Sequence, residues 1–415
     1  MNLKEKLKEI IIQNQERIKG VYVVDREYNT EKEGNYVVIG PRRAGKTFFL
    51  YQTIKNRYKE GDFHKFLYIN FEDERIMELN HTKLDLILKS YNELYNETPD
   101  LYFDEIQNID HWEKFARRLS DQGYKIMITG SNSKMLSKEI ATTLGGRFIV
   151  QKIFPLSFKE YLKFNNIVLK QNFEYSDQLN TVKRSFEEYF QYGGFPELIK
   201  FNNKRDYLSN LFQKVFYGDI LSRHKVKNEQ AMKLLIKKIS ESVNNETSIS
   251  RIKNLIKSTG IPIGTATLIE YMNYLEESFL TFSVENFNNK FVERETKKKY
   301  YFVDNGLLML YLFDKDTKLL ENSVYIELSR HNDEIYFLKK NHEIDFYTPN
   351  EKGLYQVSYD ISEPETRKRE VKSLSKKMSE LKIQSATIIT KDSEEKIHIE
   401  NLKINVVPIW KWLLK

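Results

Sequence analysis

The segment from residue 40 to residue 47 constrains the fold of this 415-residue chain more than any other. It reads GPRRAGKT and matches the phosphate-loop pattern G-x-x-x-x-G-K-[ST] at every fixed position. The apolar run YVVI precedes it and an amphipathic run from Thr47 to Tyr58 follows, which predicts a strand, a loop and a helix. In that arrangement, backbone N–H groups and the helix N-terminus surround phosphate oxygens. The sequence therefore predicts a nucleotide-binding site, and a purely structural glycine turn is the alternative.

The residues of this loop are the candidate ligands of the nucleotide. The ammonium of Lys46 would reach the β- and γ-phosphates, and the hydroxyl of Thr47 would coordinate Mg²⁺. ATP and Mg²⁺ are the expected cofactors, although the pattern itself does not distinguish ATP from GTP. The full set of predicted ligands is Gly40, Pro41, Arg42, Arg43, Ala44, Gly45, Lys46 and Thr47.

A short apolar strand that ends in two carboxylates predicts the second half of the site. Residues 101–105 read LYFDE. Asp104 would hold Mg²⁺ opposite Thr47, and Glu105 would act as the general base that polarises an attacking water. Adjacent carboxylates of this kind favour hydrolysis over transfer to a small acceptor. The alternative is an ordinary surface turn after a buried strand.

A further strand-like run, KIMITGSNS (residues 125–133), ends in polar side chains. Thr129, Ser131 or Asn132 would lie beside the γ-phosphate and sense the nucleotide state. Ordinary turn chemistry is the alternative for each of them.

Composition predicts a protein of the cytoplasm with several domains. At about 150 residues per domain, 415 residues correspond to about three domains. The absence of cysteine excludes disulfides and suits a reducing compartment. The charged first segment, MNLKEKLKEIIIQ, is not a signal peptide, and no apolar stretch reaches the roughly 18 residues of a membrane span. The net charge of +7 permits contact with nucleic acid without requiring it.

Several motifs at matched spacing resemble those of the archaeal-type ATPases, a family of AAA-like P-loop proteins. The resemblance covers nearly the whole chain and implies an α/β fold with four parts. These are an AAA-like parallel-sheet core (residues 1–165), a helical lid (166–244), a winged helix-turn-helix (245–315) and a smaller α/β nuclease-like domain (316–415). The motifs are GPRRAGKT, YINFEDER, LYFDEIQNI, ITGSNS, LGGR, FPLSFKEYL, YGGFPE, YGDILSR and VVPIWKWLL.

The resemblance also implies roles for two residues that spacing does not reveal. Arg147 of LGGR resembles an arginine that lies near the γ-phosphate or reaches a neighbour's site, which makes it a candidate catalytic residue and allows for an oligomer. A surface ion pair is the alternative. Pro196 of GGFP resembles the lid proline whose ring packs on the base of the nucleotide. A simple helix break is the alternative there.

From about residue 245 the pattern predicts a winged helix. SISRIKNLIKST and TATLIEYMNYLEESFL read as helices, and LTFSVEN and KKYYFVD read as a β-hairpin. Double-stranded DNA is the expected partner, with the second helix in the major groove and Lys297–Lys299 on phosphate. That helix carries Glu270, Glu276 and Glu277 but no Arg or Lys. Contact with an unidentified protein partner is therefore the alternative.

The last hundred residues resemble the PD-(D/E)xK nuclease fold, with two changes in the expected site. Glu321 or Glu327 matches the first helix and Asp345 matches the second strand. The third strand reads QVS at residues 356–358 where (Asp/Glu)-x-Lys is expected. Two-metal cleavage needs clustered carboxylates and a cation, so we expect a catalytically inactive scaffold. A displaced lysine such as Lys372 would restore the cation.

These features predict a cytoplasmic, Mg²⁺-dependent ATPase that couples ATP binding and hydrolysis to a winged-helix output. Two alternatives stay open. One is a switch that holds ATP with little turnover and acts through a protein partner. The other is an ATP-regulated DNA nuclease.

Overall fold

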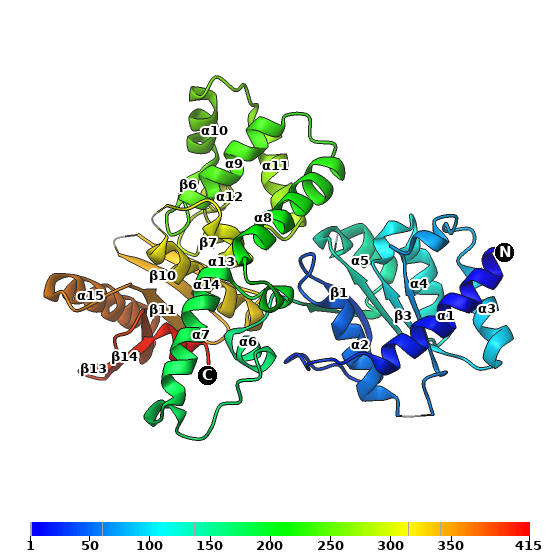
Figure 1. Ribbon diagram of the computed structural model, residues 1–415. Helices are drawn as coiled ribbons and strands as arrows, with labels where there is room; N and C mark the ends of the chain where they lie inside the picture. Colours follow the sequence, from blue (N-terminus) through cyan, green and yellow to red (C-terminus); the bar gives the residue numbers. More distant parts are fainter. Residues whose placement is uncertain (1, 60, 137, 314, 341) are drawn as a thin grey trace. The chain divides into compact units, whose positions relative to one another are not determined.

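The computed structural model of the protein describes residues 2–59, 61–136, 138–313, 315–340 and 342–415. Contacts divide the chain into two compact units, Met1–Phe154 and Pro155–Lys415. Each unit has its own sheet (Figure 1). None of the helices described is both long enough and apolar enough to cross a lipid bilayer.

The first unit is built on a five-stranded sheet with the order β2-β3-β4-β1-β5, and all its strand pairs are parallel. Four of the strands are almost fully buried, as a parallel sheet covered on both faces requires. The predicted α/β fold with a parallel sheet is therefore confirmed. The strands are β1 (Asn35–Ile39), β2 (Phe66–Asn70), β3 (Asp100–Asp104), β4 (Ile126–Gly130) and β5 (Phe148–Lys152).

Helices connect and cover these strands. In α2, which follows the phosphate loop, Phe49, Leu50 and Ile54 recur at helical spacing and pack in one core with Tyr36 and Val38 of β1. This packing fixes the start of the helix beside the end of the strand. The helices are α1 (Leu3–Gly20), α2 (Lys46–Arg57), α3 (Asp85–Tyr95), α4 (Trp112–Asp121) and α5 (Lys138–Leu144), with short 3₁₀ turns η1 (Glu74–Ile76), η2 (Ile106–Asn108) and η3 (Ser133–Leu136).

The second unit contains a nine-stranded mixed sheet with the order β13-β14-β12-β11-β10-β9-β7-β8-β6. The antiparallel hairpin β7/β8 is the one predicted for the winged helix, and β7 also pairs in parallel with β9. The hairpin therefore lies inside a larger sheet. The strands are β6 (Thr247–Ser248), β7 (Thr281–Asn286), β8 (Lys297–Phe302), β9 (Tyr336–Lys339), β10 (Glu343–Thr348), β11 (Gly353–Val357), β12 (Ser385–Thr390), β13 (Glu395–Ile399) and β14 (Leu402–Pro408).

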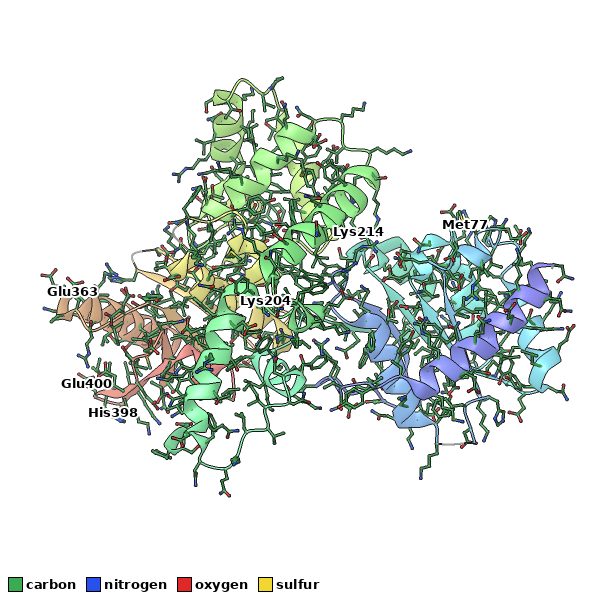
Figure 2. All side chains as sticks on the ribbon, in the orientation of Figure 1. Met77, Lys204, Lys214, Glu363, His398 and Glu400 are labelled. Atoms are coloured by element: carbon green, nitrogen blue, oxygen red, sulfur yellow. The ribbon has the colours of Figure 1, made fainter. Side chains whose placement is uncertain are left out.

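The segment predicted as a lid is helical, and further helices follow it. Lys204 and Lys214, labelled in Figure 2, mark the two ends of α8. The domain boundaries predicted at residues 165, 244 and 315 stay predictions. The helices are α6 (Phe158–Phe164), α7 (Gln178–Tyr192), α8 (Lys204–Lys214), α9 (Glu229–Glu241), α10 (Ile249–Ser258), α11 (Thr265–Glu277), α12 (Phe291–Thr296), α13 (Asn305–Met309), α14 (Asp316–His331), α15 (Pro364–Leu381) and α16 (Ile409–Trp412), with η4 (Phe173–Tyr175), η5 (Pro196–Lys200) and the π-helix η6 (Val215–Ser222).

The Gly-Gly turn after α7 is anchored by Asp304, which is buried. The Gly194 N–H donates to the Asp304 carboxylate at 2.7 Å, and the Gly194 carbonyl accepts from the Leu156 N–H at 2.7 Å. Gly193 has a φ of 78°, and a Cβ there would lie 1.9 Å from the Asp304 carboxylate. Only glycine fits so close an approach at a positive φ. Burial raises the pKa of Asp304 to about 6, although the N–H groups of Gly194 and Gly306 oppose the rise.

Candidate nucleotide-binding site

The phosphate loop joins the end of β1 to the start of α2, and its backbone is conformationally demanding. Gly40 has a φ of 155°, and a Cβ at this position would lie 2.0 Å from the carbonyl oxygen of Ile153. Gly45 caps α2 with a φ of 99°, and Arg43 adopts a φ of 63°. Left-handed conformations at a non-glycine residue are uncommon and concentrate at functional sites. The loop is therefore held in a specific curved shape.

The ammonium of Lys46 lies against the carbonyl groups of its own loop. Its Nζ donates to the carbonyl oxygens of Gly40 and Pro41, each at 3.1 Å, and the side chain is buried. The same Nζ lies 3.5 Å from Oε1 of Glu105. A single buried cation thus connects the phosphate loop to the carboxylate at the end of β3.

Asp104 receives three hydroxyl hydrogen bonds and is fully buried. Its Oδ2 accepts from the Thr47 and Tyr68 hydroxyls, each at 2.8 Å, and its Oδ1 accepts from the Thr129 hydroxyl. Burial, and secondly the charge of Glu105, raise the pKa of Asp104, while the three hydroxyl groups oppose the rise. The predicted Mg²⁺ ligands Thr47 and Asp104 are therefore in direct contact.

Glu105 follows β3 directly and has a left-handed backbone, with a φ of 52°. Its N–H donates to the Thr129 hydroxyl at 2.9 Å, and its Oε2 accepts from the Gln107 amide at 2.5 Å. Burial opposes ionisation, but the Lys46 ammonium and the Gln107 amide outweigh it, so that the pKa of Glu105 is lowered. The side chain is therefore an ionised carboxylate, the form that a general base needs.

Tyr68, which donates to Asp104, and Gln107 are polar residues of this site that the sequence patterns do not reveal. The Nε2 of Gln107 contacts Glu105 and lies 3.5 Å from the Ser131 hydroxyl. Its Oε1 is buried and has no hydrogen-bond partner among the residues that the structure describes. The available signal was its place in the LYFDEIQNI motif, just after the two carboxylates.

The polar residues predicted at the end of β4 lie with the carboxylates. Thr129 bridges them, since its hydroxyl donates to Asp104 and accepts from the Glu105 N–H. Ser131 and Asn132 are both buried. The sensing role predicted for these residues stays a prediction.

Three other predicted residues have different surroundings. Arg42 pairs with Glu72, with 3.3 Å between Nη1 and Oε1. Arg147 is exposed and pairs with Asp121, so its catalytic role stays a prediction. Pro196 belongs to the second unit, where it is half-buried and begins the short helix η5.

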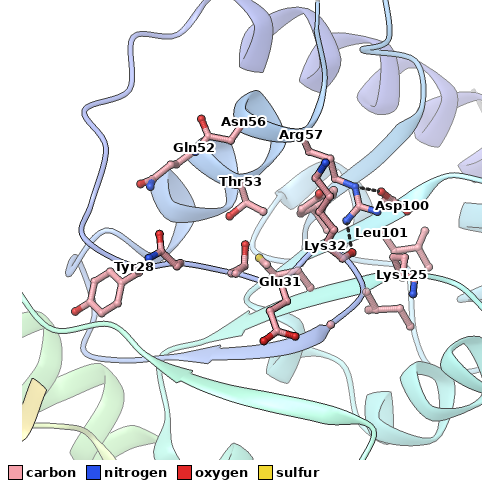
Figure 3. Close-up of a pocket in the computed structure, with 16 residues that line it drawn as sticks. Tyr28, Glu31, Lys32, Gln52, Thr53, Asn56, Arg57, Asp100, Leu101 and Lys125 are labelled. Carbon is pink, nitrogen blue, oxygen red and sulfur yellow. Dashed lines mark hydrogen bonds and ion pairs between the residues drawn. The ribbon is translucent and has the colours of Figure 1, made fainter. Parts of the chain in front are cut away.

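A cavity of about 200 Å³ opens at the end of the first unit's sheet that lies away from the phosphate loop, where β3 and β4 begin (Figure 3). Two of its charged side chains pair with each other, since Arg57 lies 2.8 Å from Asp100, and Arg57 also donates to the Lys32 carbonyl at 3.0 Å. The nucleotide-site residues lie at the other end of the sheet, at the carboxyl ends of the strands.

Comparisons with known proteins agree with this arrangement. The model of an AAA domain family matches residues 32–162, which contain the phosphate loop and both carboxylates. A second model, of a domain of unknown function called DUF8612, matches residues 183–318. The parallel sheet and this match together identify an AAA-like P-loop domain in the first unit.

The chain belongs to the same family as the uncharacterized protein MJ1544 of Methanocaldococcus jannaschii, to which it is 37% identical over 424 residues, covering 98% of this chain and 94% of that protein. An uncharacterized protein of Haemophilus influenzae is 32% identical over 340 residues, with 79% of this chain and 83% of that protein covered. Among solved structures, the Walker-type ATPase paby2304 of Pyrococcus abyssi is similar with a TM-score of 0.39 and 14% identity, over 74% of this chain and 95% of that chain.

Proposed function

We propose that the protein hydrolyses ATP in a Mg²⁺-dependent reaction with Glu105 as the general base. The observation that carries this proposal is the continuous set of contacts at the ends of β1 and β3. Thr47 contacts Asp104 at 2.8 Å, and Lys46 lies 3.5 Å from an ionised Glu105. These contacts hold the phosphate loop and the two carboxylates, which we propose as metal ligand and base, within one site.

Mg²⁺ fits the oxygen groups of this site, since the ion prefers carboxylate and hydroxyl oxygen ligands. Thr47 and Asp104 would hold it, and its charge would offset that of the β- and γ-phosphates. Loop N–H groups and Lys46 would bind the same phosphates. A water molecule would attack the γ-phosphorus and lose its proton to Glu105, while the bond to the β–γ bridging oxygen breaks. Gln107 would hold the Glu105 carboxylate in the required orientation.

Replacing Asp104 with asparagine should weaken the use of Mg²⁺ and leave ATP binding largely intact. The amide keeps the shape of the side chain but removes the negative charge, so the Mg²⁺ concentration for half-maximal turnover should rise by roughly 10- to 100-fold. Phosphate release measured across a Mg²⁺ titration provides the test. Asp110→Asn, at an exposed position soon after β3, is the matched control. An unchanged Mg²⁺ dependence in Asp104→Asn would remove Asp104 from the metal site.

We also propose a DNA contact for the winged-helix segment, with protein contact as the alternative. The segment contains α10, α11 and the β7/β8 hairpin in the expected order, but the expected tip contains the short helix α12, and an additional strand, β6, pairs antiparallel with β8. Arg251 and Lys257 of α10 are exposed, and so is Lys297 at the start of β8. The prediction that Lys299 contacts phosphate is wrong, because this side chain is completely buried. We therefore propose that the exposed cations of α10 and Lys297 make the contact, in place of the second helix, α11, which carries no Arg or Lys.

Replacing Arg251, Lys257 and Lys297 together with alanine should weaken binding to unrelated DNA duplexes to a similar extent. These side chains would contact phosphates and not base edges. The negative slope of log affinity against log salt should therefore become shallower by roughly 2 to 3. Fluorescence anisotropy titrations between about 50 and 200 mM salt measure this slope.

The matched control for the DNA experiment replaces Lys368, Lys396 and Lys403, three exposed lysines on α15, β13 and β14. These elements lie away from α10 within the second unit (Figure 1). An equal loss in both triple variants would show that only net charge matters. No binding by the wild type at about 50 mM salt would favour the protein-partner alternative.

A further inference from the structure

A fully buried ammonium lies among three carboxylates in the second unit. The Nζ of Lys299, on β8, is 3.2 Å from Oε1 of Glu321, 3.1 Å from Oε1 of Glu343 and 3.1 Å from Oδ1 of Asp345. Glu321 comes from α14, and the other two carboxylates come from β10. The Phe337 ring centroid lies 5.5 Å from the same Nζ. We call this group the ammonium cluster; it consists of Lys299, Glu321, Glu343 and Asp345.

The ammonium cluster contains the carboxylates that the sequence predicts for a nuclease-like site. Of the two candidates on α14, Glu321 belongs to it, whereas Glu327 pairs with Arg330 at 3.2 Å on its own helix. Because Phe346 of β10 pairs with Tyr355 of β11, the next pair in this antiparallel ladder is Asp345 opposite position 356. The predicted site is therefore assembled, and its cation comes from Lys299 and not from Lys372.

A divalent cation, which the nuclease-like fold implies, does not fit this site. Oxygen atoms of all three carboxylates already face the ammonium, and Oε1 of Glu321 also accepts from the Tyr301 hydroxyl at 2.7 Å. Gln356 supplies an amide in place of a carboxylate, and its Oε1 is buried without a partner in the described chain. Among the residues that the structure describes, no three His, Asp or Glu side chains are grouped to hold a metal ion.

The number and spacing of the groups match an ammonium. An ammonium has three N–H donors, and three carboxylates surround it at distances of 3.1 to 3.2 Å. Mg²⁺ and Ca²⁺ need oxygens at about 2.0 to 2.6 Å. Burial alone would lower the pKa of Lys299, but the three carboxylates outweigh it and raise the pKa, so the side chain stays charged. Burial raises the pKa of Glu321 to about 7, with Lys299 opposing the rise.

We propose that the ammonium of Lys299 permanently replaces a divalent cation in the nuclease-like site. The wild-type protein therefore holds no metal there. The carboxylates form a metal site only when the ammonium is removed. Glu343 also pairs with Lys339 at 3.1 Å. Removing Lys299 therefore leaves Glu321 and Asp345 buried without their cation, which is strongly unfavourable. A small divalent ion is the direct substitute for the lost charge. This inference does not depend on the proposed ATPase activity.

The test uses the full-length, nucleotide-free protein with Mn²⁺ as the probe. An Asp104→Asn background removes the proposed metal ligand of the phosphate loop from every sample. We expect the background protein to have the same Tm in EDTA and in Mn²⁺. Lys299→Met should lower the Tm in EDTA, regain most of the loss in Mn²⁺, and bind one additional Mn²⁺ by electron paramagnetic resonance. Adding Asp345→Asn to Lys299→Met should abolish both the recovery of Tm in Mn²⁺ and the binding of the additional Mn²⁺.

Lys298→Met is the matched control, because Lys298 precedes Lys299 on β8 but pairs with Glu285 at 3.1 Å. It should bind no additional Mn²⁺ and show no Mn²⁺-dependent Tm. Mn²⁺ binding at this site by the background protein would overturn the proposal. A Tm of Lys299→Met that is the same in EDTA and in Mn²⁺ would also overturn it.

A variant that removes the charges keeps the test decisive if Lys299→Met fails to fold in EDTA. Folding of Lys299→Met on addition of Mn²⁺ would support the proposal. The charge-depleted protein Lys299→Met/Glu321→Gln/Asp345→Asn should fold in EDTA, and its Tm should not change on addition of Mn²⁺. If Lys299→Met stays unfolded in Mn²⁺, whether or not the charge-depleted variant folds, a metal cannot replace the ammonium and the proposal is wrong.

Discussion

Replacing Lys46 with alanine should reduce the affinity for ATP by about 100-fold or more. The ammonium would donate charge-assisted hydrogen bonds to two phosphates, each worth roughly 1.5 to 3 kcal/mol. It is also the buried cation that lowers the pKa of Glu105, so its loss should raise that pKa toward its usual range. Isothermal titration with ATP and Mg²⁺ measures the affinity directly.

The control for this experiment is Lys65→Ala. Lys65 is exposed, pairs with Asp62 at 2.7 Å and precedes β2. It should bind ATP like the wild type. Thermal melts of both variants would show whether each stays folded. Wild-type affinity in a folded Lys46→Ala protein would mean that residues 40–47 do not bind phosphate.

The sequence predicts the first unit well because its signals are local. The phosphate-loop pattern determines a strand, a curved loop and a helix in succession, and the short apolar runs correspond to the buried strands. Parallel strands bring their carboxyl ends to one edge of the sheet. The contact between Thr47 and Asp104, which are far apart in sequence, follows from that geometry.

The contribution of Gln107 could not be predicted in the same way. Its amide reaches Glu105 because the backbone turns sharply at Glu105, in the left-handed region, directly after β3. Nothing in a pattern of residue types indicates that turn. Whether a polar residue after a strand points at the site or at solvent depends on such single dihedral angles.

The sequence prediction that fails most clearly is the exposure of all three lysines at the start of β8. A run of lysines usually marks a solvated tip, and Lys297 is indeed exposed. Lys299 is buried because β7 and β8 join a sheet whose next strand, β9, begins at Tyr336. A strand pairing between distant parts of the chain decides this burial, and local patterns carry no information about it.

Replacing Glu105 with glutamine should leave ATP binding near the wild-type level and slow hydrolysis by roughly 100- to 10,000-fold. The amide keeps the size of the side chain and can still contact Gln107, but it cannot accept the proton of water. Because the pKa of Glu105 is lowered in the wild type, the carboxylate should be ionised throughout the neutral range. Turnover should therefore decline only in acid, as the carboxylate becomes protonated. Rates of phosphate release across this pH range check both expectations.

The most direct test of the ATPase assignment is phosphate release from ATP by the wild type and Glu105→Gln, with bound nucleotide measured in the same samples. We expect multiple turnovers by the wild type in Mg²⁺, none in EDTA, and normal occupancy with stalled release in Glu105→Gln. Equal rates in the two proteins would contradict the role of Glu105. Full occupancy of the wild type by ATP without turnover would contradict the ATPase assignment itself and leave a nucleotide-binding switch.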